Sequence, residues 1–496
     1  MLIGNRDRFA IELVPVSPSW EPRYEPEAAA WAGLGIWVRG KNLCAHVRAG
    51  EEELRTSLFV PLGPIADWLV RAYPGLAFEE RPRWFETTRR LHDVVRKWGE
   101  SPPPVGVDED AWLDDREAFW SRHFLLAGAE GAWLPNLCLL REDDDVIVAW
   151  REPPAHSVDP ITFLNAEGSV RVAWQDVHAV LSRFVDEVAL AFEQRKLAPY
   201  AWLAAVPSRL HVAVSGPEII ALYCARSLQQ VAELLDVREG DVSDVLGAEA
   251  VVDPATNPLC QVFRDLPPGP SEGVGGEARV TLDHSTKATR SSALALWKTA
   301  RALALDAARP AETAERAGQL AAAAVRRALA LDDQPIDTRD ALDRSGVVAR
   351  TSAVEANHEH MLVVAARRCA PAVTILQTVQ TRKRWGNRFE EARALGHALL
   401  DPLRGDALGA ASTKWTPSVR RRRSGAFAAE LLLPKRVLDI SSGGHLDGVG
   451  QGQAFTDLIE RYGVGATTAA WQLYNHKLVS LPVRDELIEL YAGRGD

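Results

Sequence analysis

Residues 389–401, FEEARALGHALLD, have the residue types and spacing of a helix that could carry chemistry on one face. On such a helix, two His residues at i and i+4 can bind zinc, and a Glu beside the first His can act as the general base. Here Arg393 lies four residues before His397, and Ala394 occupies the position of the base. A guanidinium does not deprotonate, and a methyl group cannot accept a proton. We therefore predict no catalytic residues and no metal at Arg393, Ala394 and His397.

The side chains at these positions could still form a defined arrangement without zinc. Glu390, Arg393 and His397 share one helical face at spacings of three and four. One hypothesis is that the Arg393 guanidinium stands where a zinc ion would, and that it ties Glu390 into a cleft that a partner could use. The alternative is an ordinary surface pair, worth about 0.2–0.5 kcal/mol. His397, with three leucines nearby, is also typical of a satisfied core histidine.

Arg420, Arg421, Arg422 and Arg423 form the most basic run in the chain. Such a run is typical of a solvated loop. It is also a candidate contact for phosphate or nucleic acid, together with residues 382–384 if the two segments lie close. The histidines of residues 358–360, HEH, would point to opposite faces of a strand, so we expect them to bind no metal.

Composition limits the class of protein. The chain has 496 residues and a net charge of −10, so it should hold several domains, and any nucleic-acid contact must use a local basic patch. The five cysteines form no CxxC pair, which fits a reducing cytoplasm. No signal peptide and no membrane span is expected, because no apolar run reaches about 18 residues.

The order of patterns predicts a multidomain α+β protein, with a mixed N-terminal domain followed by mainly helical regions. Twelve of the 16 tryptophans lie in residues 1–205, where alternating segments at 34–40, 145–152 and 169–174 predict strands and 174–196 predicts a helix. We expect a Pro/Gly-rich linker at 253–280 and an alanine-rich helical hairpin at 281–333, broken at Pro310. The last domain then spans 334–496.

Residues 206–252 are similar to a helix-turn-helix module, with Val231, Ala232, Val242 and Val245 facing the contact between the two helices. Asp236 replaces the usual glycine of the turn and tolerates left-handed geometry. The second helix would offer Glu239, Asp241 and Asp244 to DNA. Carboxylates repel phosphates, so we expect packing or protein contact rather than DNA binding, although DNA contact stays an alternative.

Several segments, in order, resemble the ImmA/IrrE family of metallopeptidases. They are a helix before a strand at 335–347, a strand at 370–379, the helix at 387–401, the helix and proline at 424–434, and a closing helix pair at 455–480. The resemblance implies a zincin-like fold for the last third of the chain. It also implies that the third zinc ligand, an acidic residue, should lie where Arg420–Arg423 stand.

Active members of that family cleave transcriptional repressors in stress responses and mobile-element regulation. With the zinc-binding residues lost, the resemblance implies a catalytically inactive regulator or sensor that needs no cofactor and binds a protein partner. By analogy with that family, we expect a role in a bacterial stress-response, toxin–antitoxin or antiphage system. Two alternatives remain open, namely a DNA-binding repressor that uses the helix-turn-helix, and a hydrolase with a relocated active site.

Overall fold

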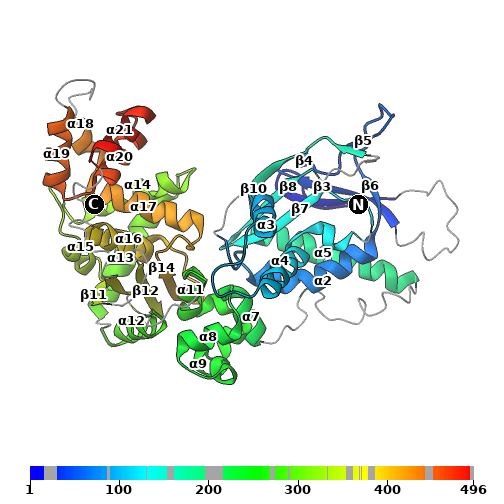
Figure 1. Cartoon of the computed structure of the whole chain (residues 1–496), viewed down its shortest axis with the longest axis horizontal. Helices are drawn as coiled ribbons and strands as arrows, with labels where there is room; N and C mark the ends of the chain where they lie inside the picture. Colours follow the sequence, from blue (N-terminus) through cyan, green and yellow to red (C-terminus); the bar gives the residue numbers. More distant parts are fainter. Residues whose placement is uncertain are drawn as a thin grey trace. The chain divides into compact units, whose positions relative to one another are not determined.

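The computed structural model shows a mixed α+β protein of several domains, and it divides into two compact units, Met1–Ala225 and Arg226–Asp496 (Figure 1). No helix in the described part of the chain is both long enough and apolar enough to cross a membrane. The structure describes residues 1–15, 31–85, 90–129, 131–152, 161–195, 210, 216–268, 274–288, 291–331, 333–353, 361–367, 369, 371–377, 386–441 and 451–491.

Antiparallel sheets form the strand layer of the N-terminal unit. The first has the order β1-β2-β3-β4, with β6 also paired to β3; the second has the order β10-β8-β7; and β5 pairs with β9. The strands predicted at 34–40, 145–152 and 169–174 correspond to β3, β8 and β10. The bounds are β1 Leu2–Asn5, β2 Phe9–Val14, β3 Trp31–Val38, β4 Lys41–Asn42, β5 His46–Arg48, β6 Leu58–Pro61, β7 Asn136–Glu142, β8 Asp145–Arg151, β9 Ile161–Phe163 and β10 Gly168–Ala173.

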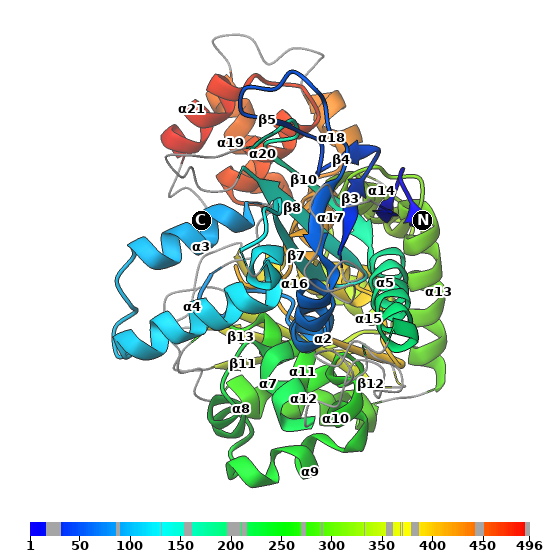
Figure 2. The ribbon, with the colours of Figure 1, turned by 90° about the vertical axis from the view of Figure 1, so that its right-hand side faces the viewer.

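The helices α2 and α5 pack against each other beneath the strands of this unit (Figures 1 and 2). The predicted amphipathic helix at 174–196 is α5, and its buried face joins the same core as Trp68 and Trp150. Helix α7 packs on α2, so this unit ends at residue 225 and not at the predicted boundary of 205. The bounds are α2 Leu62–Phe78, α3 Leu91–Glu100, α4 Glu109–His123, α5 Trp174–Arg195 and α7 Gly216–Cys224.

The second unit begins with a helix, a turn and a short helix. In α8 (Leu228–Leu235) the side chains of Val231 and Ala232 are buried, and Ser227 and Gln230 form a capping box. Asp236 adopts the left-handed conformation (φ 54°), as its place in the turn predicts. The second helix, α9 (Val242–Leu246), has five residues, and Val245 on it is 39% exposed, so the prediction that Val245 faces the first helix is wrong.

The prediction of a linker at 253–280 is wrong over most of its length. Helix α11 (Pro258–Asp265) and the first part of α12 (Val274–Ala288) occupy this region, which directly follows α10 (Ala248–Val252), and every residue of α11 is buried. Asn257 caps α11, since its side chain accepts hydrogen bonds from the backbone N–H groups of Leu259 and Cys260. The first residue of a helix has no intrahelical hydrogen bond to its N–H, so proline, which lacks this group, loses nothing at that position. Pro258 therefore starts this helix rather than breaking it.

A four-stranded sheet with the order β11-β13-β12-β14 lies at the centre of the second unit. The strands β11 and β13 are parallel, and the other pairs are antiparallel. Thr374 of β13 contacts Thr281 of α12 (2.6 Å between the hydroxyl oxygens), while the adjacent Val373 joins the apolar cluster that contains α16, so the two helices cover opposite faces. The bounds are β11 Val348–Ala353, β12 Met361–Arg367, β13 Ala372–Gln377 and β14 Ala407–Ala411.

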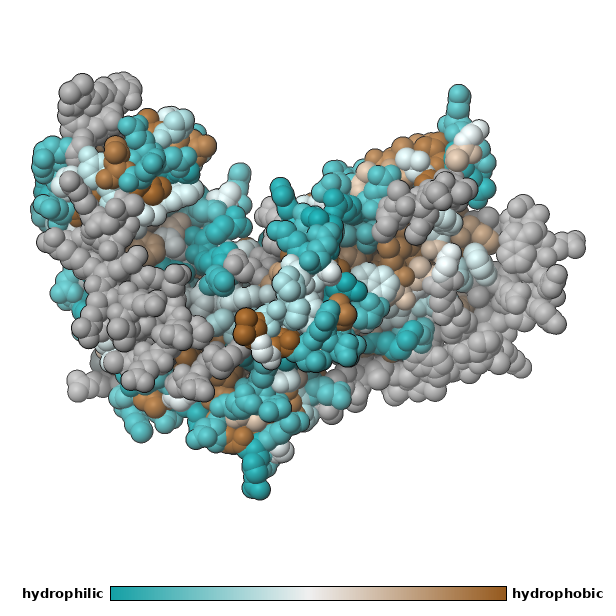
Figure 3. Space-filling model, in the orientation of Figure 1, coloured by the Kyte–Doolittle hydropathy of each residue, from teal (hydrophilic) through white to brown (hydrophobic). Residues whose placement is uncertain are grey.

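Helices complete the second unit around α16. The predicted alanine-rich hairpin is α13 and α14, and α14 packs closely against α17 because Gly318 has no side chain; a Cβ there would lie 2.2 Å from the carbonyl oxygen of Arg423. Figure 3 shows hydrophobic residues among hydrophilic ones over the last helices, where Trp471, Leu481 and Leu490 are exposed. The bounds are α13 Ser291–Ala308, α14 Ala314–Ala328, α15 Thr338–Arg344, α16 Gly386–Leu400, α17 Ser418–Leu432, α18 Lys435–Ser441, α19 Gln451–Tyr462, α20 Ala466–Asn475 and α21 Leu481–Tyr491.

Candidate functional site

Helix α16 carries the three positions where sequence reasoning looked for zinc chemistry. Ala394 and His397 are fully buried, and Arg393 is largely buried. Arg393 Nη1 donates to Glu390 Oε1 at 3.1 Å, and the two side chains are only 14% and 10% exposed. The pair is therefore more buried than the ordinary surface pair that was the alternative. Removal of either partner would leave a mostly buried charge uncompensated.

His397 does not join the Glu390–Arg393 pair but bonds to Asp401, which lies four residues further along the chain, directly after the end of α16. His397 Nδ1 lies 2.8 Å from Asp401 Oδ2, so the carboxylate holds the proton on Nδ1. The other ring nitrogen, Nε2, is buried and has no hydrogen-bond partner in the described part of the chain. This orientation is the one that a metal-binding His adopts when a carboxylate holds its second nitrogen.

Asp401 is the centre of a buried ion cluster that joins α16 to α17. Arg423 Nη2 donates to Asp401 Oδ1 at 2.9 Å, and Arg420 Nη1 lies 3.8 Å from Asp401 Oδ2. Burial by itself would raise the pKa of Asp401, but the charges of His397, Arg420 and Arg423 outweigh it and hold the pKa well below its usual range. Asp401 is therefore ionised at neutral pH and serves as the shared counter-ion of the cluster.

Two side chains of α13 hold the end of α16 from the other side. Trp297 Nε1 donates to the carbonyl oxygen of Ala398 at 3.0 Å. Arg301 donates to the carbonyl oxygens of Ala398 (3.2 Å) and Asp401 (2.6 Å), which are among the unpaired carbonyls of the last helical turn. Burial lowers the pKa of Arg301 to about 10; Asp401 opposes this shift and Arg423 adds to it. Arg301 is still a cation at neutral pH.

The four-arginine run lies on α17 and not in a solvated loop. Arg420 is 1% exposed and, like Arg423, it is directed to Asp401. Arg421 donates to the carbonyl oxygen of Lys414 (2.6 Å), and Arg422 pairs with Glu315 (3.0 Å). The run therefore does not present four guanidinium groups on one surface. Of the phosphate patch predicted from Arg420–Arg423, Arg420 and Arg423 point inward to Asp401 and are not offered to a ligand. Residues 382–384 and 358–360 lie outside the described residues.

The residues present around His397 do not fit a zinc ion. Zinc sites use three or four neutral or anionic ligands, and here the positions expected for the other ligands hold Arg393 and the arginines of α17. Asp401 is already shared by an imidazole and two guanidinium groups. Among the described residues, no group of three or more His, Cys, Asp or Glu side chains could hold a metal ion.

Sequence reasoning missed Asp401 and Arg301. The signal for Asp401 was present, because it ends the stretch that begins at Phe389 and lies at i+4 from His397. Arg301 gave no local signal, since it lies 100 residues from the carbonyl group that it binds.

Comparison with known proteins adds little to this geometry. No protein-family model matches the chain, and no curated protein matches it. Among solved structures, the chain is similar to CdiI from Burkholderia dolosa AUO158, with 16% identity over 38% of this chain and 99% of that one. The TM-score of 0.24 is too low to carry an argument about fold or function.

Proposed function

We propose that this protein acts by binding a protein partner, as a regulator or sensor built on a peptidase-like domain that does not hydrolyse peptides. The observation that supports the proposal is the ion cluster of Asp401 with His397, Arg420 and Arg423. Guanidinium groups stand where a metal site needs ligands, so the residues on α16 and α17 offer no means of activating water. In this proposal, the domain keeps its fold and offers a surface to which a protein partner binds.

The setting that we propose is the bacterial cytoplasm, in a stress-response, toxin–antitoxin or antiphage system. This part rests on the resemblance to ImmA/IrrE proteins and is an analogy. It is consistent with the cysteines, which are all buried and free of disulfide bonds.

The loss of hydrolysis is tested by metal analysis and by peptide cleavage. We expect purified full-length protein to contain far less than one zinc per chain after exposure to equimolar Zn²⁺. We also expect proteins recovered with it to be intact. Stoichiometric zinc that disappears in His397→Ala, or a cleavage product that the same variant fails to make, would overturn the proposal. These results would favour the alternative of a hydrolase.

The binding activity is tested with the full-length chain, cross-linked in its own cells and identified by mass spectrometry. We expect one protein to be recovered in stoichiometric amount, and the complex to re-form from the two purified proteins. Arg393→Ala then tests whether the Glu390–Arg393 region contributes. Unchanged stability and unchanged partner affinity in that variant would remove this region from the binding surface. Failure of the purified proteins to associate would remove the proposal itself.

The alternative of a DNA-binding repressor is tested by a gel shift with genomic DNA fragments at moderate salt. The second helix of the helix-turn-helix, α9, has five residues, and Arg238 before it is paired with Asp241 at 3.2 Å. With Glu239 and Asp244 beside them, we expect no specific shift. A specific shift that is lost in Arg238→Ala would favour the repressor.

A further inference from the structure

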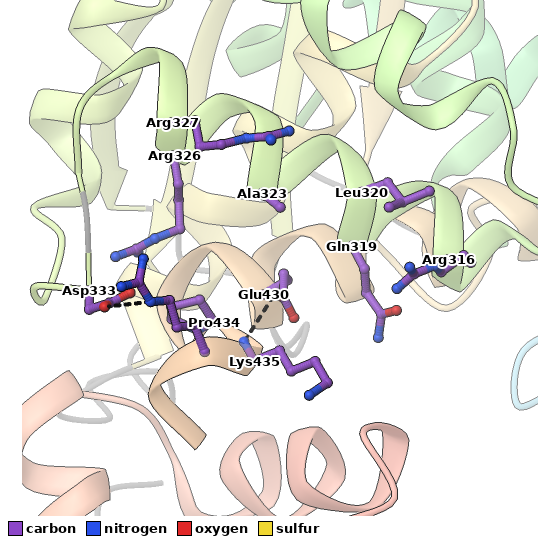
Figure 4. Close-up of a pocket in the computed structure, with 11 residues that line it drawn as sticks. Arg316, Gln319, Leu320, Ala323, Arg326, Arg327, Asp333, Glu430, Pro434 and Lys435 are labelled. Atoms are coloured by element: carbon purple, nitrogen blue, oxygen red, sulfur yellow. Dashed lines mark hydrogen bonds and ion pairs between the residues drawn. The ribbon is translucent and has the colours of Figure 1, made fainter. Parts of the chain in front are cut away.

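A second site lies away from α16, in a pocket where α14, α17 and the start of α18 meet. Its volume is about 530 Å³, which is within the range of pockets that hold small molecules. Figure 4 shows Arg316 and Gln319 on α14, Glu430 on α17 and Lys435 on α18 around this space. All these elements belong to the second unit, so the pocket is complete within one part of the chain.

Basic residues outnumber acidic ones in the wall of this pocket. Five cations line it, namely Arg316, Arg326, Arg327, Lys435 and Arg436, against the two carboxylates Asp333 and Glu430. The local excess of positive charge contrasts with the net charge of −10 of the chain. A concave basic site on an acidic protein attracts anions locally.

Both carboxylates of the pocket already have partners. Glu430 accepts hydrogen bonds from the backbone N–H of Lys435 (3.0 Å) and from Gln472 (3.0 Å), and it lies 2.8 Å from His476 Nε2. Asp333 pairs with Arg436 at 3.2 Å. These carboxylates are therefore occupied in structural contacts and are not directed at the other arginines of the pocket.

The arginines differ in how firmly they are held. Arg326 is 4% exposed and donates to the carbonyl oxygens of Leu431, Leu331 and Gln334, so its guanidinium group is fixed in the wall. Arg316 and Arg327 are exposed, and the structure records no side-chain hydrogen bond or ion pair for either of them within the described ranges. They are available to a ligand without breaking an existing contact.

We propose that this pocket binds the phosphate chain of a nucleoside di- or triphosphate. Guanidinium groups match phosphate oxygens in pairs, and several cations in one cavity favour a ligand with several negative charges. A single inorganic phosphate would fill little of 530 Å³, while Leu320, Ala323 and Pro434 give the wall an apolar part for the rest of the molecule. The pocket and the ion cluster of Asp401 are separate, so this proposal holds or fails independently of the proposed function.

The test is equilibrium binding of ATP, pyrophosphate and adenosine to the full-length protein by titration calorimetry. We expect ATP to bind more tightly than pyrophosphate, adenosine to bind at least tenfold more weakly than ATP, and both phosphate ligands to lose affinity as salt rises. Arg316→Glu should weaken ATP binding about tenfold or more, since it reverses a charge in the wall. The control is Arg309→Glu, whose side chain is 81% exposed outside the pocket.

The choice of Arg316→Glu also separates binding from folding. Thr313 caps α14, and its hydroxyl accepts the backbone N–H of residue 316, so a Glu there creates the capping-box pattern and keeps the helix start stable. Absence of ATP and pyrophosphate binding at about 10 mM and low salt would overturn the proposal. So would equal losses in Arg316→Glu and Arg309→Glu. Pyrophosphate binding as tight as that of ATP would overturn the nucleoside part and leave a phosphate-chain site.

Discussion

Replacement of Asp401 by Asn tests the ion cluster between α16 and α17 most directly. The change keeps the size of the side chain but removes the only carboxylate that Arg420, Arg423 and His397 share in the described part of the chain. Breaking a buried ion cluster by removal of one partner typically costs about 3–5 kcal/mol, because the other charges stay buried. Arg420 is 1% exposed, so the upper part of this range applies unless water enters.

Hydrogen exchange followed by mass spectrometry measures this cost where it arises. Peptides that cover α16 and α17 should lose about 10³- to 10⁴-fold in protection, while peptides of α2 and α5 in the other unit should show no change. Asp406→Asn is the matched control, since Asp406 is exposed and Asn tolerates its left-handed backbone (φ 62°). Equal protection of α16 in Asp401→Asn and Asp406→Asn would refute the assignment of Asp401 as the shared counter-ion.

The dependence on pH gives a second readout of the same cluster. Because the folded pKa of Asp401 is lowered, its ionised form contributes stability above the unfolded pKa of about 4, and this contribution is lost as pH falls below that value. The difference in opening free energy between the native chain and Asp401→Asn should stay constant from about pH 7 to pH 5. It should then shrink as pH falls below about 4. A difference that instead grows towards low pH would contradict the assignment.

Three further variants test the packing around the cluster and the turn. Gly409→Ala should increase hydrogen exchange in α11, because a Cβ there would lie 2.1 Å from the carbonyl oxygen of Pro258. The control is Gly240→Ala, since a Cβ at Gly240 would have nothing within 4 Å. Equal exchange of α11 in both variants would contradict the expectation. Asp236→Ala should cost about 1 kcal/mol relative to Asp236→Gly in the local opening of α8, because only glycine enters the left-handed region freely, and equal protection would argue against that turn. Arg393→Ala should lower the free energy of unfolding by about 1–3 kcal/mol, because Glu390 would stay buried without its partner. A denaturation experiment that shows no loss of stability in Arg393→Ala would mean that the two residues behave as an ordinary surface pair.

The elements with strong periodicity could be predicted from the sequence. The spacing of apolar residues in α5 and the alternation in β3, β8 and β10 are local signals, and they identify both the type of element and its place. The left-handed turn at Asp236 was also local, because few residues other than Gly, Asn and Asp tolerate it. The Glu390–Arg393 contact follows from helical spacing in the same way.

The predicted linker failed because proline and glycine were read by composition rather than by position. Pro258 lies at the first turn of α11 behind the capping Asn257, where proline favours a helix. The burial of α11 depends on contacts that no local window contains. Gln261 Oε1 accepts a hydrogen bond from the backbone N–H of Gly409 at 2.6 Å, and Asp265 Oδ2 accepts one from that of Ala411 at 3.3 Å. Side chains of α11 thus provide hydrogen-bond partners for backbone N–H groups of the edge strand β14.

The arginine run illustrates the same limit on charge patterns. A run of like charges predicts a solvated surface only if all its members face water, and four consecutive residues of a helix cannot share one face. On α17 the positions three apart, Arg420 and Arg423, turn to Asp401, while Arg421 and Arg422 between them turn outward to Lys414 and Glu315. In the proposed function, the two inward guanidinium groups take over the task that a zinc ion would have, since both join α16 to α17 through opposite charge. Loss of the metal then does not have to open the domain, which makes a retained fold without hydrolysis physically consistent.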